Sequence, residues 1–136
     1  MLKTVLRLVL ALFYGVAGYA HIANPAPFLQ ITPDWVPMAD AVIFWTGIAE
    51  LAGAIALLQP WAARLRYYAG IGLAAYALCV WPANINHMLM DLASADGGAG
   101  LGYHIPRMIA QPILIWLALW LGEVTQWPFG NRRSAE

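Results

Sequence analysis

Apolar residues occur in four long stretches rather than in the one-faced or alternating patterns of soluble elements. The stretches cover residues 2–23, 38–59, 66–90 and 104–123. A helix that crosses a bilayer needs about 20 mainly apolar residues, and each stretch has that length. Helices satisfy their own backbone hydrogen bonds, as lipid requires, and the strand alternation of a membrane barrel is missing. The pattern predicts an all-α integral membrane four-helix bundle that forms a single domain over residues 1–136.

The first stretch also resembles a cleavable signal peptide. Lys3 and Arg7 give it a basic start, and the Gly-Tyr-Ala that ends at Ala20 has the small residues of a cleavage site. However, His21 and the Asn-Pro that follows soon after it are more typical of a helix end. We therefore expect this segment to be retained as the first membrane-spanning helix.

The composition agrees with a membrane protein. Apolar residues make up 62% of the chain and charged residues 10%, whereas soluble domains average about 25% charged residues. Seven basic side chains balance seven acidic ones, so we expect membrane lipid and no nucleic acid among the partners. The single cysteine excludes an intrachain disulfide and a Cys-x-x-Cys centre.

Basic residues are distributed unevenly along the chain. Six of the seven lie at the start of the first stretch, at the junction of the second and third, or in the tail: Lys3, Arg7, Arg64, Arg66, Arg132 and Arg133. The connections 24–37 and 91–103 contain none. Because positive residues stay on the cytoplasmic side of a membrane, we predict that both termini are cytoplasmic. Arg107, near the outer end of the fourth stretch, is the exception.

Polar side chains gather near the expected outer ends of three helices, with the proline-rich connection 24–37 expected to fold over them. Ionisable groups at membrane depth are costly and therefore indicate a functional site. The predicted ligand-binding residues are His21, Asn84, His87, His104 and Arg107. The alternative is that these groups only join helices through hydrogen bonds.

Glu50 is the deepest charge in the chain. Counting residues at about 1.5 Å each places it about 18 Å below the outer end of its helix, at a level close to Tyr14 and Tyr76. We predict a hydrogen-bonded Tyr14–Glu50–Tyr76 layer beneath the outer polar groups, with Glu50 as a buried proton site. A purely structural hydrogen bond is the alternative for Glu50.

The sequence gives little support to metal or triad chemistry. No His-x-x-x-His or Cys-x-x-Cys spacing occurs, so we expect neither a metal site nor haem. No serine lies within the four stretches to act as a nucleophile.

Several short motifs follow one another in a fixed order. They are Gly-Tyr-Ala-His at 18–21, Pro-Phe at 27–28, Ile-Thr-Pro at 31–33, Trp-Val-Pro at 35–37, Gly-Ile-Ala-Glu-Leu at 47–51, Leu-Leu-Gln-Pro at 57–60 and Trp-Pro-Ala-Asn-Ile at 81–85. Together they resemble the DoxX-like family of small bacterial integral membrane proteins, over about residues 10–122. The resemblance implies a multi-pass four-helix bundle in the bacterial inner (plasma) membrane.

The same resemblance implies an association with redox proteins, because the family is named after a subunit associated with a thiosulfate:quinone oxidoreductase. Its pattern covers positions whose roles it does not define: His21, Glu50, Pro82, Asn84 and Arg107. This chain has no cysteine pair for a thiol relay. A redox partner protein and a quinone ligand are therefore expectations that follow from the resemblance.

The leading interpretation is a redox-associated membrane protein whose outer-facing polar cavity binds a small ligand, either a quinone or a lipid-like molecule. Arg107 would attract an anionic or carbonyl oxygen, the histidines would exchange protons, and Asn84 would orient the ligand.

A membrane enzyme that uses Glu50 and a histidine as acid and base is a second hypothesis. It ranks lower because depth separates these groups by more than about 10 Å, and a structure that placed Glu50 beside His21 would reverse that order. A non-catalytic scaffold that docks a partner protein is a third hypothesis. A proton-coupled exporter is a fourth, and it would require a homodimer to enclose a pathway.

Overall fold

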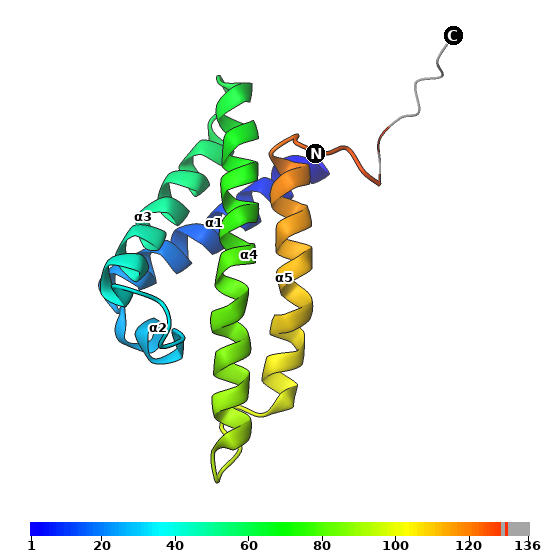
Figure 1. The fold of residues 1–136 in the computed structure, drawn as a ribbon. Helices are drawn as coiled ribbons and strands as arrows, with labels where there is room; N and C mark the ends of the chain where they lie inside the picture. Colours follow the sequence, from blue (N-terminus) through cyan, green and yellow to red (C-terminus); the bar gives the residue numbers. More distant parts are fainter. Residues whose placement is uncertain (129, 131–136) are drawn as a thin grey trace.

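The computed structural model describes residues 1–128 and 130, and within them the chain is helical with no strands (Figure 1). Four helices are long and apolar enough to cross a membrane, as predicted. A short fifth helix lies in the connection between the first two long helices. The helices are α1 (Leu2–Ala23), α2 (Ala26–Ile31), α3 (Ala39–Leu58), α4 (Ala63–Ala93) and α5 (Leu101–Leu121).

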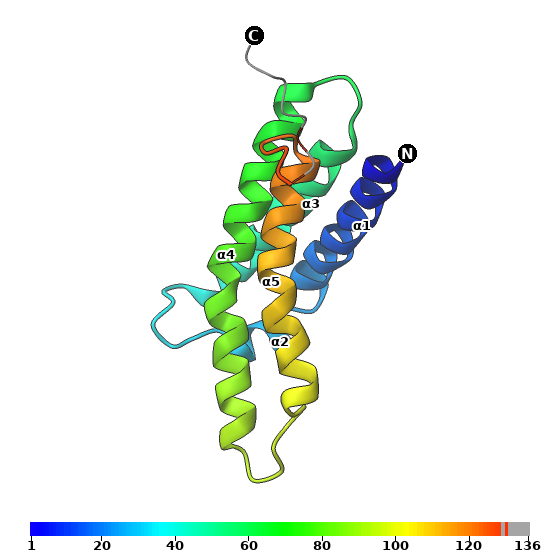
Figure 2. The same cartoon turned by 90° about the vertical axis from the view of Figure 1, so that its right-hand side faces the viewer.

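The four long helices pack mainly as two pairs. α1 packs against α3 and α4 packs against α5, while α3 also contacts α4 and joins the pairs. The start of α1 and the end of α5 lie at the same end of the bundle (Figures 1 and 2). This placement agrees with an even number of crossings. The cytoplasmic assignment of that end stays a prediction, and Arg132 and Arg133, which contributed to it, lie outside the described residues.

Apolar side chains occupy both the inside and the outside of the bundle. Tyr14, Leu57, Leu73 and Leu121 are buried in the core. Large exposed apolar side chains occur on every long helix, including Val9, Leu12, Val16, Trp45, Ile55, Leu78 and Ile109. Such an exterior is unfavourable in water and favourable in lipid. The fold is therefore consistent with a multi-pass membrane protein.

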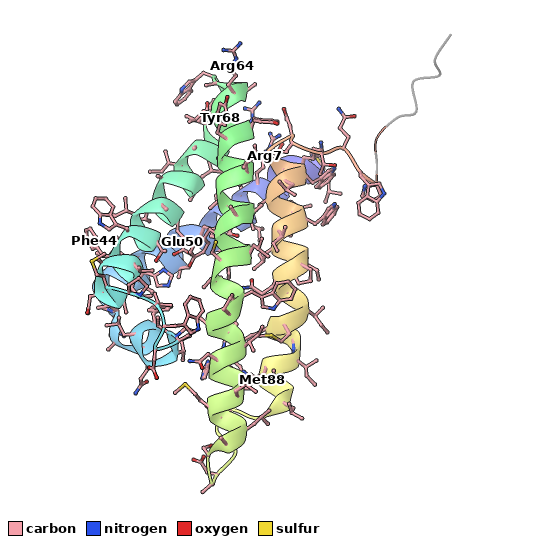
Figure 3. The ribbon with its side chains drawn as sticks, in the orientation of Figure 1. Arg7, Phe44, Glu50, Arg64, Tyr68 and Met88 are labelled. Atoms are coloured by element: carbon pink, nitrogen blue, oxygen red, sulfur yellow. The ribbon has the colours of Figure 1, made fainter. Side chains whose placement is uncertain are left out.

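Charged side chains connect several segments at the end of the bundle where the N-terminus lies. The Arg7 guanidinium donates to the Leu121 carbonyl oxygen at 3.0 Å and forms an ion pair with Glu123 at 2.5 Å. Arg66 lies 3.9 Å from the other oxygen of the same carboxylate. Three chain segments are thereby tied together where α5 ends. Arg7 and Arg64 both lie toward this end (Figure 3).

At the opposite end, α4 and α5 extend beyond the α1–α3 pair (Figures 1 and 2). The 31 residues of α4 correspond to about 46 Å, more than the hydrocarbon core of about 30 Å. Both helices are longer here than the predicted stretches 66–90 and 104–123. The connection is only residues 94–100, because glycines in the left-handed region at 97, 98 and 100 let the backbone turn sharply.

Candidate functional site

A cavity of about 430 Å³ lies inside the bundle and receives side chains from all five helices. Most of its wall is apolar or aromatic, and a few polar groups interrupt that wall. The polar lining residues are Tyr14, His21, Glu50, Tyr76, Asn84, Arg107 and Gln111. A cavity of this size, with few polar groups on apolar walls, has the properties of a small-molecule site.

His21 and Glu50 form a direct contact at this cavity. The distance between His21 Nδ1 and Glu50 Oε2 is 2.5 Å, and the two side chains are 5% and 2% exposed. Glu50 points from α3 into the bundle, whereas Phe44 of the same helix points outward (Figure 3). The predicted depth gap between Glu50 and the histidines is therefore wrong for His21.

Counting residues separated these two groups because it placed the end of α1 and the start of α3 at one height, whereas Gly18 of α1 faces Glu50 and Gly47 of α3 faces His21. Side chains on a helix lean toward its N-terminus, and α1 and α3 run in opposite directions along each other. His21 on α1 therefore leans toward the middle of the bundle, and Glu50 on α3 leans toward the outer end. The offset of the helix ends removes most of the predicted gap, and the lean of the two side chains closes the rest.

The predicted tyrosine layer is only partly present. The Tyr76 side chain lies beside Glu50 at the cavity wall. The Tyr14 hydroxyl instead donates to the Leu73 carbonyl oxygen at 3.5 Å, although the Tyr14 and Tyr76 rings contact edge to face. The acidic group at the cavity is thus a His21–Glu50 pair with Tyr76 beside it, and among the described residues Tyr14 forms no hydrogen bond to Glu50.

Arg107 occupies another part of the cavity wall. Its guanidinium donates to Asn84 Oδ1 at 2.5 Å and to His87 Nδ1 at 2.9 Å, and it lies 4.9 Å from the centre of the Tyr103 ring. The predicted convergence of Asn84, His87 and Arg107 is confirmed. Within the part of the chain that the structure describes, no carboxylate forms an ion pair with Arg107.

The proline-rich connection covers the cavity, as predicted. The Phe28 ring of α2 lies 3.9 Å from the His21 ring, centre to centre, and Phe28 and Ile31 both contribute to the cavity wall. The Asn86 side-chain amide donates to the Ile31 carbonyl oxygen at 3.0 Å and fixes the end of α2 to α4. The sequence predicted a cover here but did not identify Phe28 as its contact with His21.

His87 and His104 do not line the cavity, contrary to the prediction for a ligand site. They lie between α4 and α5, near the connection 94–100 that joins the two helices, and both rings face Asp91. His104 Nε2 lies 2.8 Å from Asp91 Oδ2, and His87 Nε2 lies 3.6 Å from the same oxygen. Sequence reasoning missed Asp91 because it assigned this residue to a loop, although the i, i+4 spacing from His87 was visible.

The same three residues are the group that could hold a metal ion. His87, Asp91 and His104 each offer a ligand atom, and these atoms lie within 4.8 Å of one another. A metal-bound histidine normally donates its other ring N–H to an acceptor. Here His87 Nδ1 instead faces the donor Arg107, and His104 Nδ1 is buried with no partner among the described residues. The surroundings of the second ring nitrogens therefore do not match a metal centre, and the three side chains instead connect α4 to α5 next to the hairpin.

Asp91→Ala should loosen the hairpin that joins α4 to α5. The Asp91 carboxylate accepts the Ala99 amide at 2.9 Å as well as His104, so its loss frees both the connection and the first turn of α5. We expect amide hydrogen exchange to become about ten times faster around Ala99, as for the loss of about 1.4 kcal/mol of local stability.

Asp96→Ala is the matched control for this experiment, because Asp96 bonds only to Ser94 and Gly98 within the connection. It should accelerate exchange at Gly98 alone. Unchanged exchange around Ala99 in the Asp91 variant would show that Asp91 does not hold the hairpin.

These features define a class of protein: an all-helical chain with four potential membrane-spanning helices around a buried, partly polar cavity. Residues 10–122 match the family described as "Domain of unknown function (DUF8561)", so the chain belongs to that family. No curated protein and no solved structure matches the chain.

Proposed function

We propose that the cavity binds a small amphipathic molecule, quinone-like or lipid-like, and that the His21–Glu50 pair exchanges a proton with an oxygen of that molecule. The observation that carries this proposal is the 2.5 Å contact of His21 with Glu50 at the wall of a 430 Å³ cavity. A buried acid–base pair beside a space large enough for a ligand is a frequent arrangement at functional sites.

The hydrogen bond to Glu50 defines which nitrogen of His21 is reactive. If Nδ1 carries the proton that Glu50 accepts, Nε2 of the neutral ring has a free lone pair. No described residue hydrogen-bonds to His21 Nε2, and His21 lines the main cavity and a smaller one beside it. The imidazole can therefore accept a proton from a bound molecule, with the Glu50 carboxylate stabilising the imidazolium that forms.

The cavity walls favour a flat or elongated apolar body with polar oxygens. Phe13, Tyr14, Phe28 and Tyr76 contribute aromatic surface, while the Arg107 guanidinium supplies hydrogen-bond donors at a separate part of the wall. Quinones and lipid-like molecules combine these two properties. The resemblance in sequence supports the accompanying proposals of a bacterial inner-membrane location and a redox partner protein.

A membrane enzyme with acid–base catalysis is the second candidate. The sequence ranked this hypothesis lower because depth separated Glu50 from every histidine. The direct contact with His21 removes that reason and favours acid–base chemistry over ligand binding without proton exchange. Proton exchange is therefore part of the main proposal, and net turnover of the bound molecule would make the protein an enzyme.

Absorbance spectroscopy on the purified protein tests the proton exchange. With a nitro-substituted short-chain quinol as the probe, transfer of a proton from the quinol oxygen to His21 should produce the phenolate absorbance band in the complex at a pH where the free quinol is neutral. Glu50→Gln and His21→Gln should each remove most of this band, because His21 then lacks the carboxylate that stabilises its imidazolium or is itself replaced by a group that is not a base. Asp40→Asn, a change outside the cavity lining, should leave it intact.

The results of this experiment distinguish binding from proton exchange. Quinol binding with no phenolate band in the wild-type protein would contradict the proton role of His21 and Glu50. Failure of the quinol and of a lipid-like probe to bind at all would contradict the ligand site itself.

A further inference from the structure

The Arg107 side chain brings a positive charge to the cavity wall without a counter-ion beside it. Arg107 is a permanent cation, and its partners are neutral: the Asn84 side-chain oxygen, the His87 ring nitrogen and the Tyr103 ring. None of the carboxylates in the described residues forms an ion pair with it. Arg107 is partly buried. A partly desolvated cation without a counter-ion is costly, and a bound anion would lower that cost.

The carboxylate of Glu50, which lines the same cavity, does not serve as this counter-ion. Glu50 is engaged by His21 at 2.5 Å. When the His21 ring has taken up a proton, as the proposed function requires, the imidazolium and the carboxylate cancel each other's charge. In that state a ligand meets one net positive charge on the cavity wall, which is the charge of Arg107.

The cavity also has an apolar opening. α1 and α5 make few contacts with each other, and residues of both helices line the cavity. Phe13 of α1 and Ile113 of α5 contribute to its wall, and each is 48% exposed, more than the other lining residues. These two residues therefore mark the place where the cavity opens. In a bilayer this opening would face the acyl chains.

We infer that the ligand is an anionic amphipath, with its oxyanion head on Arg107 and Asn84 and its aliphatic tail leaving between Phe13 and Ile113. A carboxylate or a phosphate head has the required charge and acceptor oxygens. The guanidinium N–H groups of Arg107 can donate to the oxygens of either head. This inference rests on the proposed function and narrows its ligand class, because a neutral quinone leaves Arg107 without a counter-ion.

A series of probes with the same tail tests this inference. Dodecanoate, dodecyl phosphate and dodecanol share one chain length and differ in the head, so binding to the protein in nanodiscs of zwitterionic lipid isolates the effect of charge. Binding to empty nanodiscs is subtracted. We expect at least one of the two anions to bind about ten times more tightly than dodecanol, or better. The stronger of the two identifies the head as carboxylate or phosphate.

Variants of Arg107 test whether this residue is the source of the preference. Arg107→Gln should reduce the preference for the anion to about twofold or less, whereas Arg107→Lys retains the charge and should keep part of it. Arg64→Gln makes the same change at an exposed position outside the cavity and should leave the preference unchanged. Because the series is measured first on the wild-type protein, the test does not depend on the variants folding.

The possible outcomes distinguish the proposed function from the anionic head inferred for its ligand. Equal binding of the anions and dodecanol to the wild-type protein overturns the anionic head and leaves the ligand cavity standing. An anion preference that persists in Arg107→Gln overturns the assignment of the head to Arg107. If none of the three probes and no quinol binds, the proposed function fails together with this inference.

Discussion

Glu50→Leu is expected to lower the free energy of unfolding by about 1–3 kcal/mol. The variant leaves the His21 side chain buried, only 5% exposed, and without the carboxylate that it contacts at 2.5 Å. A buried polar or charged group that loses its partner retains the whole cost of its desolvation. Reversible unfolding in mixed detergent micelles measures the loss.

The double variant His21→Leu/Glu50→Leu separates this explanation from simple loss of packing. It removes both polar groups at once, so most of the stability lost in the single variant should return. Glu50→Gln retains an acceptor oxygen for His21 and should be less destabilising than Glu50→Leu. If the losses from the two single changes simply add in the double variant, His21 and Glu50 are not energetically coupled.

Gly18→Ala and Gly47→Ala are each expected to destabilise the protein by about 1–3 kcal/mol through overpacking. A Cβ on Gly18 would lie 2.7 Å from the Gly47 carbonyl oxygen, and a Cβ on Gly47 would lie 2.9 Å from the Gly18 carbonyl oxygen. Both obstacles are backbone atoms, which cannot rotate away. α1 and α3 must therefore move apart at the level of the cavity.

The same separation should weaken ligand binding, because a Cβ on Gly47 would also lie 2.9 Å from His21 Cβ. Gly15→Ala and Gly72→Ala are matched controls, since a Cβ at either position has no neighbour within 4 Å. We expect these two changes to be neutral or to stabilise their helices by up to about 1 kcal/mol. Thermal unfolding together with probe binding measures both effects, and equal behaviour of Gly15→Ala and Gly18→Ala would contradict the close-contact explanation.

Several parts of the fold were predictable from local pattern. The first span was predicted at 2–23 and is observed at Leu2–Ala23, and the second was predicted at 38–59 and is observed at Ala39–Leu58. Hydrophobic length is a property of each segment alone, so no knowledge of its neighbours is needed. The ends of α4 and α5 were less accurate because glycines at 97, 98 and 100 allow a shorter turn than their number suggested.

The candidate site was only partly predictable. The sequence correctly predicted that Asn84 and Arg107 lie close together, because both are near the ends of two consecutive antiparallel spans that the same connection joins. It misassigned His104, whose ring contacts Asp91 at 2.8 Å away from the cavity lining. A residue count along each helix gives an approximate height, but it does not give the direction of a side chain or the crossing of two helices.

The sequence by itself determined that the chain forms four long apolar helices, since lipid demands that each span satisfy its own backbone hydrogen bonds. It also restricted the unusual polar groups to a small set that includes Glu50 and Arg107. Only the tertiary structure decided that His21 is the partner of Glu50 and that, among the described residues, Arg107 has no carboxylate beside it. These facts depend on how closely α1 approaches α3 and on which way each side chain leans, and both are properties of helix pairs rather than of any single segment.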